Sequence, residues 1–239
     1  MKTEVLGVCY DNVTMCEAID AARALLQSGT TGYVVTPNAE IAYEALHSEP
    51  LRTVLNHAQL VLPDGAGVVL ASKLVRTPLK QKVAGFDFAM QLLPVLAELD
   101  LRLFLLGSKL GVAQEAAGLL KAKNPGLCIC GTADGYFSED SEAVQAICAA
   151  RADVVFVCLG APKQEFFMQR NLVASGARLM LGLGGTLDVV AGHVRRAPRW
   201  MQKLGLEWLY RLLRQPSRFG RMLRLPKYIF AALKKRWKG

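Results

Sequence analysis

The chain has 239 residues, of which 52% are hydrophobic and 21% charged, so it can form one large domain or two small ones around a well-buried core. No apolar run reaches the roughly 18 to 20 residues that a membrane-spanning helix needs. The first residues also lack the charged, apolar and small-residue sections of a secretory signal peptide. These features argue against an integral membrane protein and a secreted one, and we expect a cytoplasmic protein.

The net charge of +9 is distributed unevenly. From Arg195 to Gly239 there are 14 lysines and arginines but one acid, Glu207, which gives this segment a charge of +13 and the rest of the chain −4. A mildly acidic body therefore carries a strongly basic tail. Such asymmetry indicates a polyanionic partner: nucleic acid, an anionic lipid surface or a phosphorylated substrate.

Short apolar runs alternate with helix-like stretches along the chain. The predicted strands are Glu4–Cys9, Gly32–Thr36, Gln59–Leu62, Arg102–Gly107, Leu127–Gly131, Asp153–Leu159 and Arg178–Gly182. The clearest predicted helices are Thr14–Gln27, Gly85–Leu99, Leu110–Lys123 and Lys163–Ser175. Several strands are apolar on successive residues, which is typical of strands covered on both faces. We therefore predict an α/β fold, with a Rossmann-like, mostly parallel sheet between two layers of helices.

The composition shifts once, near Arg195, where the basic tail begins. We predict an α/β domain over residues 1–194 and a helical basic appendage over residues 195–239. Because proline breaks the interior of a helix, Pro198, Pro216 and Pro226 should divide the appendage into short helical segments.

Neither the cysteines nor the acidic residues show a metal-binding pattern. The six cysteines form no C-x-x-C pair, and four of them lie in or beside apolar runs, so we expect free thiols packed in the core. The Asp-x-Asp pair with which many nucleotide-sugar transferases hold a metal is also missing. We expect no cofactor and a mechanism without a metal.

Polar residues follow two of the predicted strands. Thr36 and Asn38 flank Pro37 where the strand Gly32–Thr36 ends, and Asp64 follows the strand Gln59–Leu62. Each can simply cap the next helix. Because ligands bind beyond the carboxyl ends of parallel strands, Thr36 and Asn38 could also hold sugar hydroxyls and Asp64 could act as a general base. Position alone does not separate these interpretations.

Two further strand ends are suited to phosphate. Residues 160–165 read GAPKQE and predict a helix N-terminus pointing at the sheet edge, where free N–H groups attract anions. The glycines of residues 182–186 permit close approach of a phosphate-bearing ligand. This loop is not a dinucleotide fingerprint, because Leu187 stands where the third glycine is required. An NAD-dependent oxidoreductase is therefore disfavoured.

The basic tail is also rich in aromatic and aliphatic side chains. It holds all three tryptophans, Trp200, Trp208 and Trp237, and its arginines 211, 214, 218 and 221 are spaced as on one helical face. Aromatic rings beside cations are typical of a surface that lies in a membrane interface. Some of these arginines could instead bind a diphosphate. A nucleic-acid-binding arm usually has fewer bulky aliphatic residues, so we favour membrane attachment and expect no nucleic acid partner.

Taken together, these segments resemble the WecG/TagA/CpsF family of glycosyltransferases, glycosyltransferase family 26, from about Thr36 to about Lys227. The matching segments are TPN (36–38), PDGAGVVLAS (63–72), VAG (83–85), LLGSK (105–109), GYF (135–137), LGAPKQE (159–165), GLGGTLDVVAG (182–192), RAP (196–198) and LGLEWLYRL (204–212). The resemblance implies transfer of N-acetylmannosamine from a UDP donor to undecaprenyl-diphosphate-linked N-acetylglucosamine, in the synthesis of teichoic acid or another cell-surface polysaccharide. A donor carrying N-acetylmannosaminuronic acid or glucose stays open.

The resemblance also implies roles for individual residues. Asp64 corresponds to the proposed catalytic base of the family, and Thr36 and Asn38 correspond to residues that line the sugar pocket. Gln164 and Glu165 fall in the segment expected near the donor.

Cationic residues complete the implied site. Arg211, Arg218 and Arg221 correspond to arginines thought to close over the diphosphate. The family commonly has arginine where this chain has Lys82, which keeps the charge but loses the planar, bidentate donor group, so the phosphate role of this position is open.

Several further expectations follow. The implied reaction inverts the anomeric configuration, with Asp64 taking the acceptor's proton and the tail excluding water from the site. The protein should lie on the inner face of the bacterial cell membrane as a peripheral protein, and its apolar tail could support a homo-oligomer. The alternative from another class is a non-catalytic nucleotide-binding module recruited to the membrane.

Overall fold

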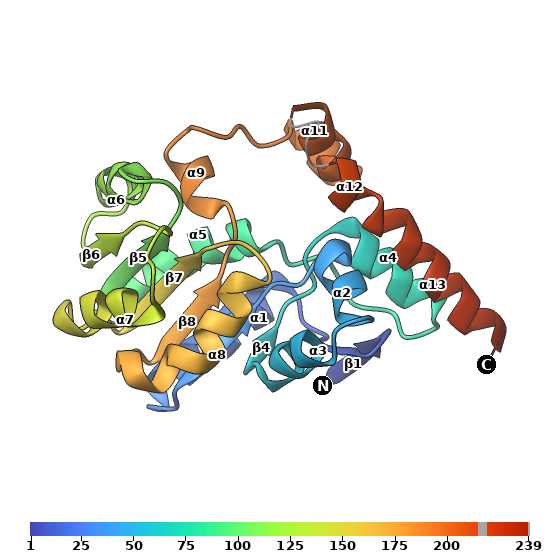
Figure 1. Cartoon of the computed structure of the whole chain (residues 1–239), viewed down its shortest axis with the longest axis horizontal. Coiled ribbons are helices and arrows are strands. Elements are labelled where there is room, and N and C mark those ends of the chain that lie inside the picture. Colours follow the sequence, from blue (N-terminus) through green and yellow to red (C-terminus); the bar gives the residue numbers. More distant parts are fainter. Residues whose placement is uncertain (215–218, 239) are drawn as a thin grey trace.

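The computed structural model describes residues 1–214 and 219–238, except for the side chains of Arg211, Arg221 and Lys238. Its centre is a six-stranded parallel sheet (Figure 1). The strand order is β4 (Leu60–Val61), β3 (Gly32–Val35), β8 (Leu179–Gly182), β7 (Val154–Cys158), β5 (Leu103–Gly107) and β6 (Ile129–Ala133). The predicted parallel α/β sheet is confirmed.

Helices cover both faces of this sheet (Figure 1). The helices of the body are α1 (Met15–Gln27), α2 (Ala39–Ala45), α3 (Glu49–His57), α4 (Ala66–Leu74), α5 (Gly85–Glu98), α6 (Val112–Lys123), α7 (Asp140–Ala149), α8 (Lys163–Ser175) and α9 (Thr186–Val190). Side chains of α1, α5 and α6 share one buried cluster, and those of α2, α3, α7 and α8 share another. Successive strand residues alternate between the clusters, with Val154 and Phe156 in the first and Val155 and Val157 in the second. This explains the continuous apolar runs in the sequence.

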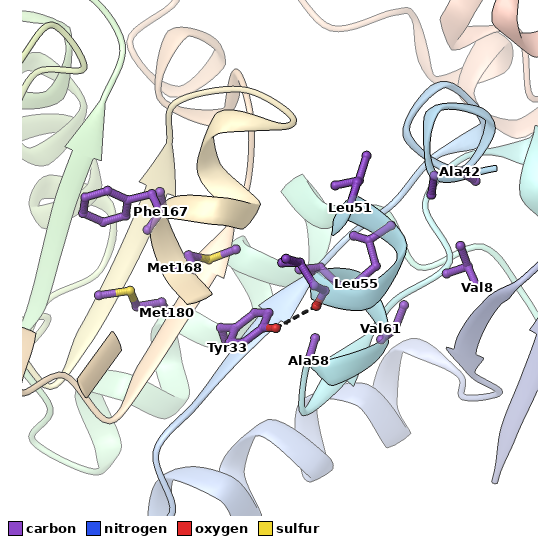
Figure 2. Close-up of a cluster of buried hydrophobic side chains, with 14 of the residues drawn as sticks. Val8, Tyr33, Ala42, Leu51, Leu55, Ala58, Val61, Phe167, Met168 and Met180 are labelled. Carbon is purple, nitrogen blue, oxygen red and sulfur yellow. Dashed lines mark hydrogen bonds between the residues drawn. The ribbon is translucent and has the colours of Figure 1, made fainter. Parts of the chain in front are cut away.

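The second cluster fixes β3 against α3 and α8 (Figure 2). The Tyr33 hydroxyl donates to the carbonyl oxygen of Val54 at 2.6 Å, so this buried polar group is satisfied. Met168 and Met180 pack beside it with their side chains fully buried. Burying a side chain of this size contributes about 1.5–3 kcal/mol. The cluster therefore holds the end of β3, where Thr36 and Asn38 follow, in a fixed position.

The N-terminus departs from the prediction. Instead of one strand over Glu4–Cys9, it forms an antiparallel hairpin of β1 (Lys2–Val5) and β2 (Val8–Asp11). The chain reverses at Leu6 and Gly7, which both have positive φ, and glycine adopts this conformation without strain. The Asp11 carboxylate then accepts the N–H of Val61 at 2.9 Å and attaches the hairpin to β4. The single-strand prediction was wrong because apolar residues continue on both sides of the turn, so the sequence shows no polar gap between the two strands.

The tail forms four helices within the described residues. These are α10 (Arg199–Lys203), α11 (Glu207–Arg214), α12 (Phe219–Met222) and α13 (Arg224–Lys238). The last of them packs along α2 and α4 (Figure 1), and it buries Tyr228 and Ala232 completely. A Cβ added at Gly67 of α4 would lie 2.5 Å from a methyl carbon of Leu225, so glycine is needed for this close packing.

Two of the three prolines divide the tail as predicted. Pro198 directly precedes α10, and Pro216 lies outside the described residues. At Pro226 the tail divides between Met222, where α12 ends, and Arg224, where α13 begins. Pro226 thus lies in the first turn of α13, where its missing N–H costs no intrahelical bond.

The cysteines are free thiols, as predicted, but most do not pack in the core. Cys158 is buried, and burial raises the pKa of its thiol to about 12. Cys16, Cys128 and Cys148 are exposed. The core-packing prediction was wrong for these three. Cys16 and Cys148 lie on exposed faces of α1 and α7, and Cys128 directly precedes β6. The residues around them do not distinguish these positions from a core strand.

Candidate active site at the carboxyl edge of the sheet

Thr36 and Asn38 lie where β3 ends, and both side chains support the backbone around them. The Thr36 hydroxyl donates to the carbonyl oxygen of Gly182 at 3.0 Å and so links the ends of β3 and β8. The Asn38 side-chain oxygen accepts the N–H groups of Glu40 and Ile41 at 2.9 and 3.1 Å and caps α2. The capping interpretation of Asn38 is therefore confirmed. Contact of either residue with a sugar stays a prediction.

Asp64 follows β4 and lies half-buried at the same edge. Its Oδ2 accepts the N–H of Gly85, the first residue of α5, at 3.5 Å. A Cβ at Gly85 would lie 2.9 Å from the Thr36 hydroxyl oxygen, so glycine brings this helix start close to the end of β3. A helix N-terminus stabilises a negative charge. Asp64 and Thr36 therefore both lie close to the start of α5.

Tyr10 lies close enough to Asp64 for the two side chains to interact electrostatically. The Tyr10 hydroxyl is fully buried and donates to the carbonyl oxygen of Pro37 at 3.3 Å. Burial, the neighbouring Tyr228 hydroxyl of α13 and the Asp64 carboxylate together hold the pKa of Tyr10 well above its ordinary value. Asp64 thus lies near the face on which the last tail helix is packed.

Gln164 and Glu165 lie at the start of α8 and are 2% and 1% exposed. The amide nitrogen of Gln164 donates to Glu165 Oε1 at 2.9 Å, and its oxygen accepts the N–H of Gly184 at 2.9 Å. Gln164 therefore fixes the glycine loop after β8. The other Glu165 oxygen, Oε2, is buried and has no hydrogen-bond partner among the described atoms. Direct contact of these two side chains with the donor stays a prediction.

Burial raises the pKa of Glu165 from 4.5 to about 7, although the hydrogen bond from Gln164 opposes this shift. The unfolded chain releases the proton first, so we expect the free energy of unfolding to fall by on the order of 1–3 kcal/mol as the pH rises through this window. Urea denaturation at pH 5 and pH 8 measures the fall. In Glu165→Gln, which cannot ionise, this part of the pH dependence should vanish. The same pH dependence in both proteins would contradict it.

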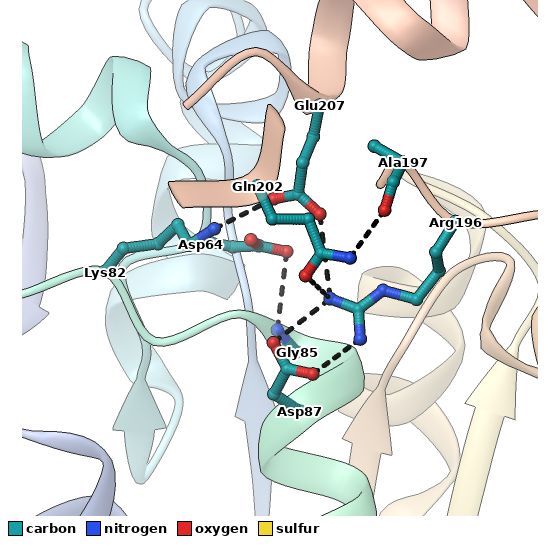
Figure 3. Close-up of polar contacts among 8 residues, drawn as sticks. All are labelled: Asp64, Lys82, Gly85, Asp87, Arg196, Ala197, Gln202 and Glu207. Atoms are coloured by element: carbon teal, nitrogen blue, oxygen red, sulfur yellow. Dashed lines mark hydrogen bonds and ion pairs between the residues drawn. The ribbon is translucent and has the colours of Figure 1, made fainter. Parts of the chain in front are cut away.

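A cluster of charged and polar side chains joins the body to the tail beside Asp64 (Figure 3). Lys82 Nζ lies 2.8 Å from Glu207 Oε2 of α11. The Arg196 guanidinium pairs with both Asp87 oxygens at 2.6 and 3.1 Å, and lies 3.2 Å from the Gln202 side-chain oxygen and 3.6 Å from Glu207 Oε1. This Lys82–Arg196 cluster, defined by these five residues, holds α10 and α11 against the start of α5.

Lys82 was a predicted site residue, but its partners in the cluster were not. The RAP segment contains Arg196, and Glu207 stands out as the one acid in the basic tail, so both carried a signal. Asp87 and Gln202 carried none, because they resemble ordinary helix-surface residues.

The predicted tail arginines cannot be compared with the site. Arg218 lies outside the described residues. Arg211 and Arg221 lie on α11 and α12, but their side chains are also outside the description. Their role over the diphosphate stays a prediction.

The glycine loops lie where they were predicted. Gly160 and Gly184 have positive φ values of 76° and 55° at the ends of β7 and β8. At the end of β5, the Ser108 hydroxyl donates to Asp188 of α9 at 2.9 Å and closes the neighbouring loop. Within residues 1–214 and 219–238, no group of three or more His, Cys, Asp or Glu side chains could hold a metal ion. Phosphate binding and the metal-free mechanism stay predictions.

Comparison with known proteins gives the class of this protein. A family model described as "Glycosyl transferase WecG/TagA/CpsF family" matches residues 3–239. The protein is therefore a glycosyltransferase. It belongs to the WecG/TagA/CpsF family, as its motifs suggested.

Three relatives carry the name N-acetylglucosaminyldiphosphoundecaprenol N-acetyl-beta-D-mannosaminyltransferase. The protein of Bacillus spizizenii strain W23 is 40% identical over 209 residues, which cover 87% of this chain and 81% of the relative. The protein of Bacillus subtilis strain 168 is 37% identical, and that of Staphylococcus aureus strain MRSA252 is 31% identical. Both of these alignments cover 98% of this chain and 92% of the relative.

Proposed function

We propose that this protein transfers N-acetylmannosamine from UDP-N-acetylmannosamine to undecaprenyl-diphosphate-linked N-acetylglucosamine, with inversion and without a metal. The names of the relatives, which match nearly the whole chain, support this choice of acceptor and sugar. The observation that carries the proposal is the position of Asp64 at the carboxyl edge of the sheet, beside Lys82 and the start of α5.

The reaction follows from this arrangement. Asp64 takes the proton of the acceptor hydroxyl, and the oxygen attacks the anomeric carbon from the face opposite UDP. A new glycosidic C–O bond forms while the bond to the β-phosphate oxygen breaks, so negative charge grows on the departing UDP. Lys82, the N-terminus of α8 and the tail arginines stabilise that charge.

A transfer assay tests the proposal. The full chain is incubated with a synthetic lipid-diphosphate N-acetylglucosamine and each of three donors, which carry N-acetylmannosamine, N-acetylmannosaminuronic acid or glucose. We expect UDP release and a lipid-linked disaccharide with the first donor, both with and without a chelator. Product from another donor instead would change the assigned sugar. UDP binding without transfer from any donor would favour a non-catalytic module.

We further propose that residues 195–239 dock the enzyme on the anionic inner face of the bacterial cell membrane. On α13, Phe230, Leu233 and Trp237 are exposed on the side opposite the buried Tyr228. Exposed lysines flank this apolar stripe, which is typical of a helix that lies in a membrane interface. No helix in the described parts of the chain is long and apolar enough to cross a membrane.

The same tail could hold copies of the chain together in solution. Its exposed side chains include Trp200, Leu204 and Leu213, besides those of α13. An exposed apolar surface of this kind favours association when no membrane covers it. We therefore propose self-association in solution that competes with membrane docking.

A further inference from the structure

The charges of the Lys82–Arg196 cluster are already paired. Lys82 contacts the carboxylate of Glu207, and Arg196 contacts that of Asp87 through two hydrogen bonds. Asp64 points into the same group, so the charged side chains drawn in Figure 3 comprise three acids and two bases. A diphosphate carries at least two further negative charges. A diphosphate that contacts Lys82 therefore competes with the carboxylate that this lysine already contacts.

The two ion pairs differ in how firmly they are built. Arg196 donates to both carboxylate oxygens of Asp87 in a fork, lies 4.4 Å over the Phe86 ring and donates to the side-chain oxygen of Gln202. Bidentate and stacked arginine contacts of this kind are the strong ones. Lys82 contacts the Glu207 carboxylate through one nitrogen at the end of a flexible chain. The Lys82–Glu207 pair is therefore the one that a ligand can replace.

The pair is also well placed for an exchange. The side chains of Lys82 and Glu207 are 25% and 20% exposed, so a bond between them is shielded from solvent but open to a ligand from one side. Leaving Lys82 partly buried without an anion would be costly, and Glu207 removes that cost while no ligand is bound. A phosphate oxygen could take over the same position, since phosphate and carboxylate both accept charge-assisted hydrogen bonds from an ammonium group.

We propose that Glu207 competes with the diphosphate of the donor for Lys82. This inference rests on the proposed function, because it takes the ligand to be a nucleoside diphosphate sugar. In the free protein, Glu207 occupies Lys82 and holds α11 against the body. Donor binding exchanges this ion pair for a lysine–phosphate contact, while the Arg196–Asp87 pair keeps α10 in place.

Binding measurements with inorganic diphosphate and with UDP test the competition, and they need neither acceptor nor turnover. The variants are Glu207→Gln, which removes the charge and keeps the shape, and Glu207→Asp, which keeps the charge. We expect the dissociation constant of both ligands to fall about three- to tenfold in Glu207→Gln, which is the range set by one partly buried ion pair. Glu207→Asp should stay near the wild-type value.

Two matched controls locate the effect at Lys82. In a Lys82→Gln background, Glu207→Gln should change the dissociation constant by less than about twofold, because the contested cation is gone. Glu17→Gln removes a similar contact, the exposed pair of Glu17 with Lys80, two residues before Lys82. It should leave the dissociation constant unchanged. Melting temperatures show whether each variant is folded.

Three outcomes would overturn the competition. These are a higher or unchanged dissociation constant in folded Glu207→Gln, an equal gain when Lys82 is absent, and no binding of diphosphate by either protein. The first would make Glu207 a purely structural contact of the tail, and the second would make its effect a general one of net charge. Absence of sugar transfer from every donor would instead contradict the proposed function, which the transfer assay measures separately.

Discussion

Replacing Asp64 by asparagine should lower the rate of sugar transfer by about 100- to 10 000-fold, the range expected when a general base is lost. The asparagine oxygen can still accept the N–H of Gly85, which Asp64 accepts at 3.5 Å, so the local structure should survive. UDP release and formation of the lipid-linked disaccharide measure the effect. Binding of UDP should change far less than the rate.

Asp20→Asn is the matched control, because Asp20 is an exposed aspartate on α1 outside the site. It should transfer sugar at the wild-type rate. Turnover of folded Asp64→Asn within about tenfold of wild type would show that another group takes the proton. The mechanism proposed here would then be wrong, although membership of the family would not change.

The double variant Phe230→Ser/Trp237→Ser should bind anionic vesicles about ten- to a hundredfold more weakly, because each aromatic side chain contributes roughly 1 kcal/mol or more at an interface. Both side chains are more than two-thirds exposed, at 69% and 86%, so removing them should not disturb the packing of α13. Vesicle sedimentation at fixed salt measures the binding. Transfer to a vesicle-borne acceptor should fall, and transfer to a short-chain soluble acceptor should not.

Point substitutions are better suited to this test than deletion of residues 195–239. Deletion would uncover the surfaces of α2 and α4 that Tyr228 and Ala232 occupy, so loss of activity could reflect unfolding. Val173→Ser removes an 85% exposed apolar side chain from α8 and serves as the control. Equal vesicle binding by the aromatic variant, the control and the wild type would contradict the docking proposal.

The sequence was sufficient to predict the parallel sheet, because each strand is encoded locally. Residues 154–158 read VVFVC, and a strand buried on both faces needs only such a run. The edge at which the candidate site lies could also be predicted. Ligands bind beyond the carboxyl ends of parallel strands, and these ends meet at one edge of the sheet. Thr36 and Asp64 follow the neighbouring strands β3 and β4, and their shared role in a site stays a prediction.

Contacts between distant segments could not be predicted in this way. The Lys82–Glu207 pair spans 125 residues and the Arg196–Asp87 pair spans 109, and no local pattern encodes either one. The hairpin at the N-terminus was missed for a related reason. Gly7 alone marks its turn, and the apolar residues on both sides read as one strand.

The packing of α13 on α4 also sets the order in which the enzyme can be completed during its synthesis. Helix α4 begins two residues after Asp64, yet the helix that covers it, α13 (Arg224–Lys238), is translated much later. Domains generally begin to fold as they leave the ribosome, from the N-terminal side. The proposed catalytic aspartate therefore lies beside an apolar surface that stays uncovered until α13 has been translated.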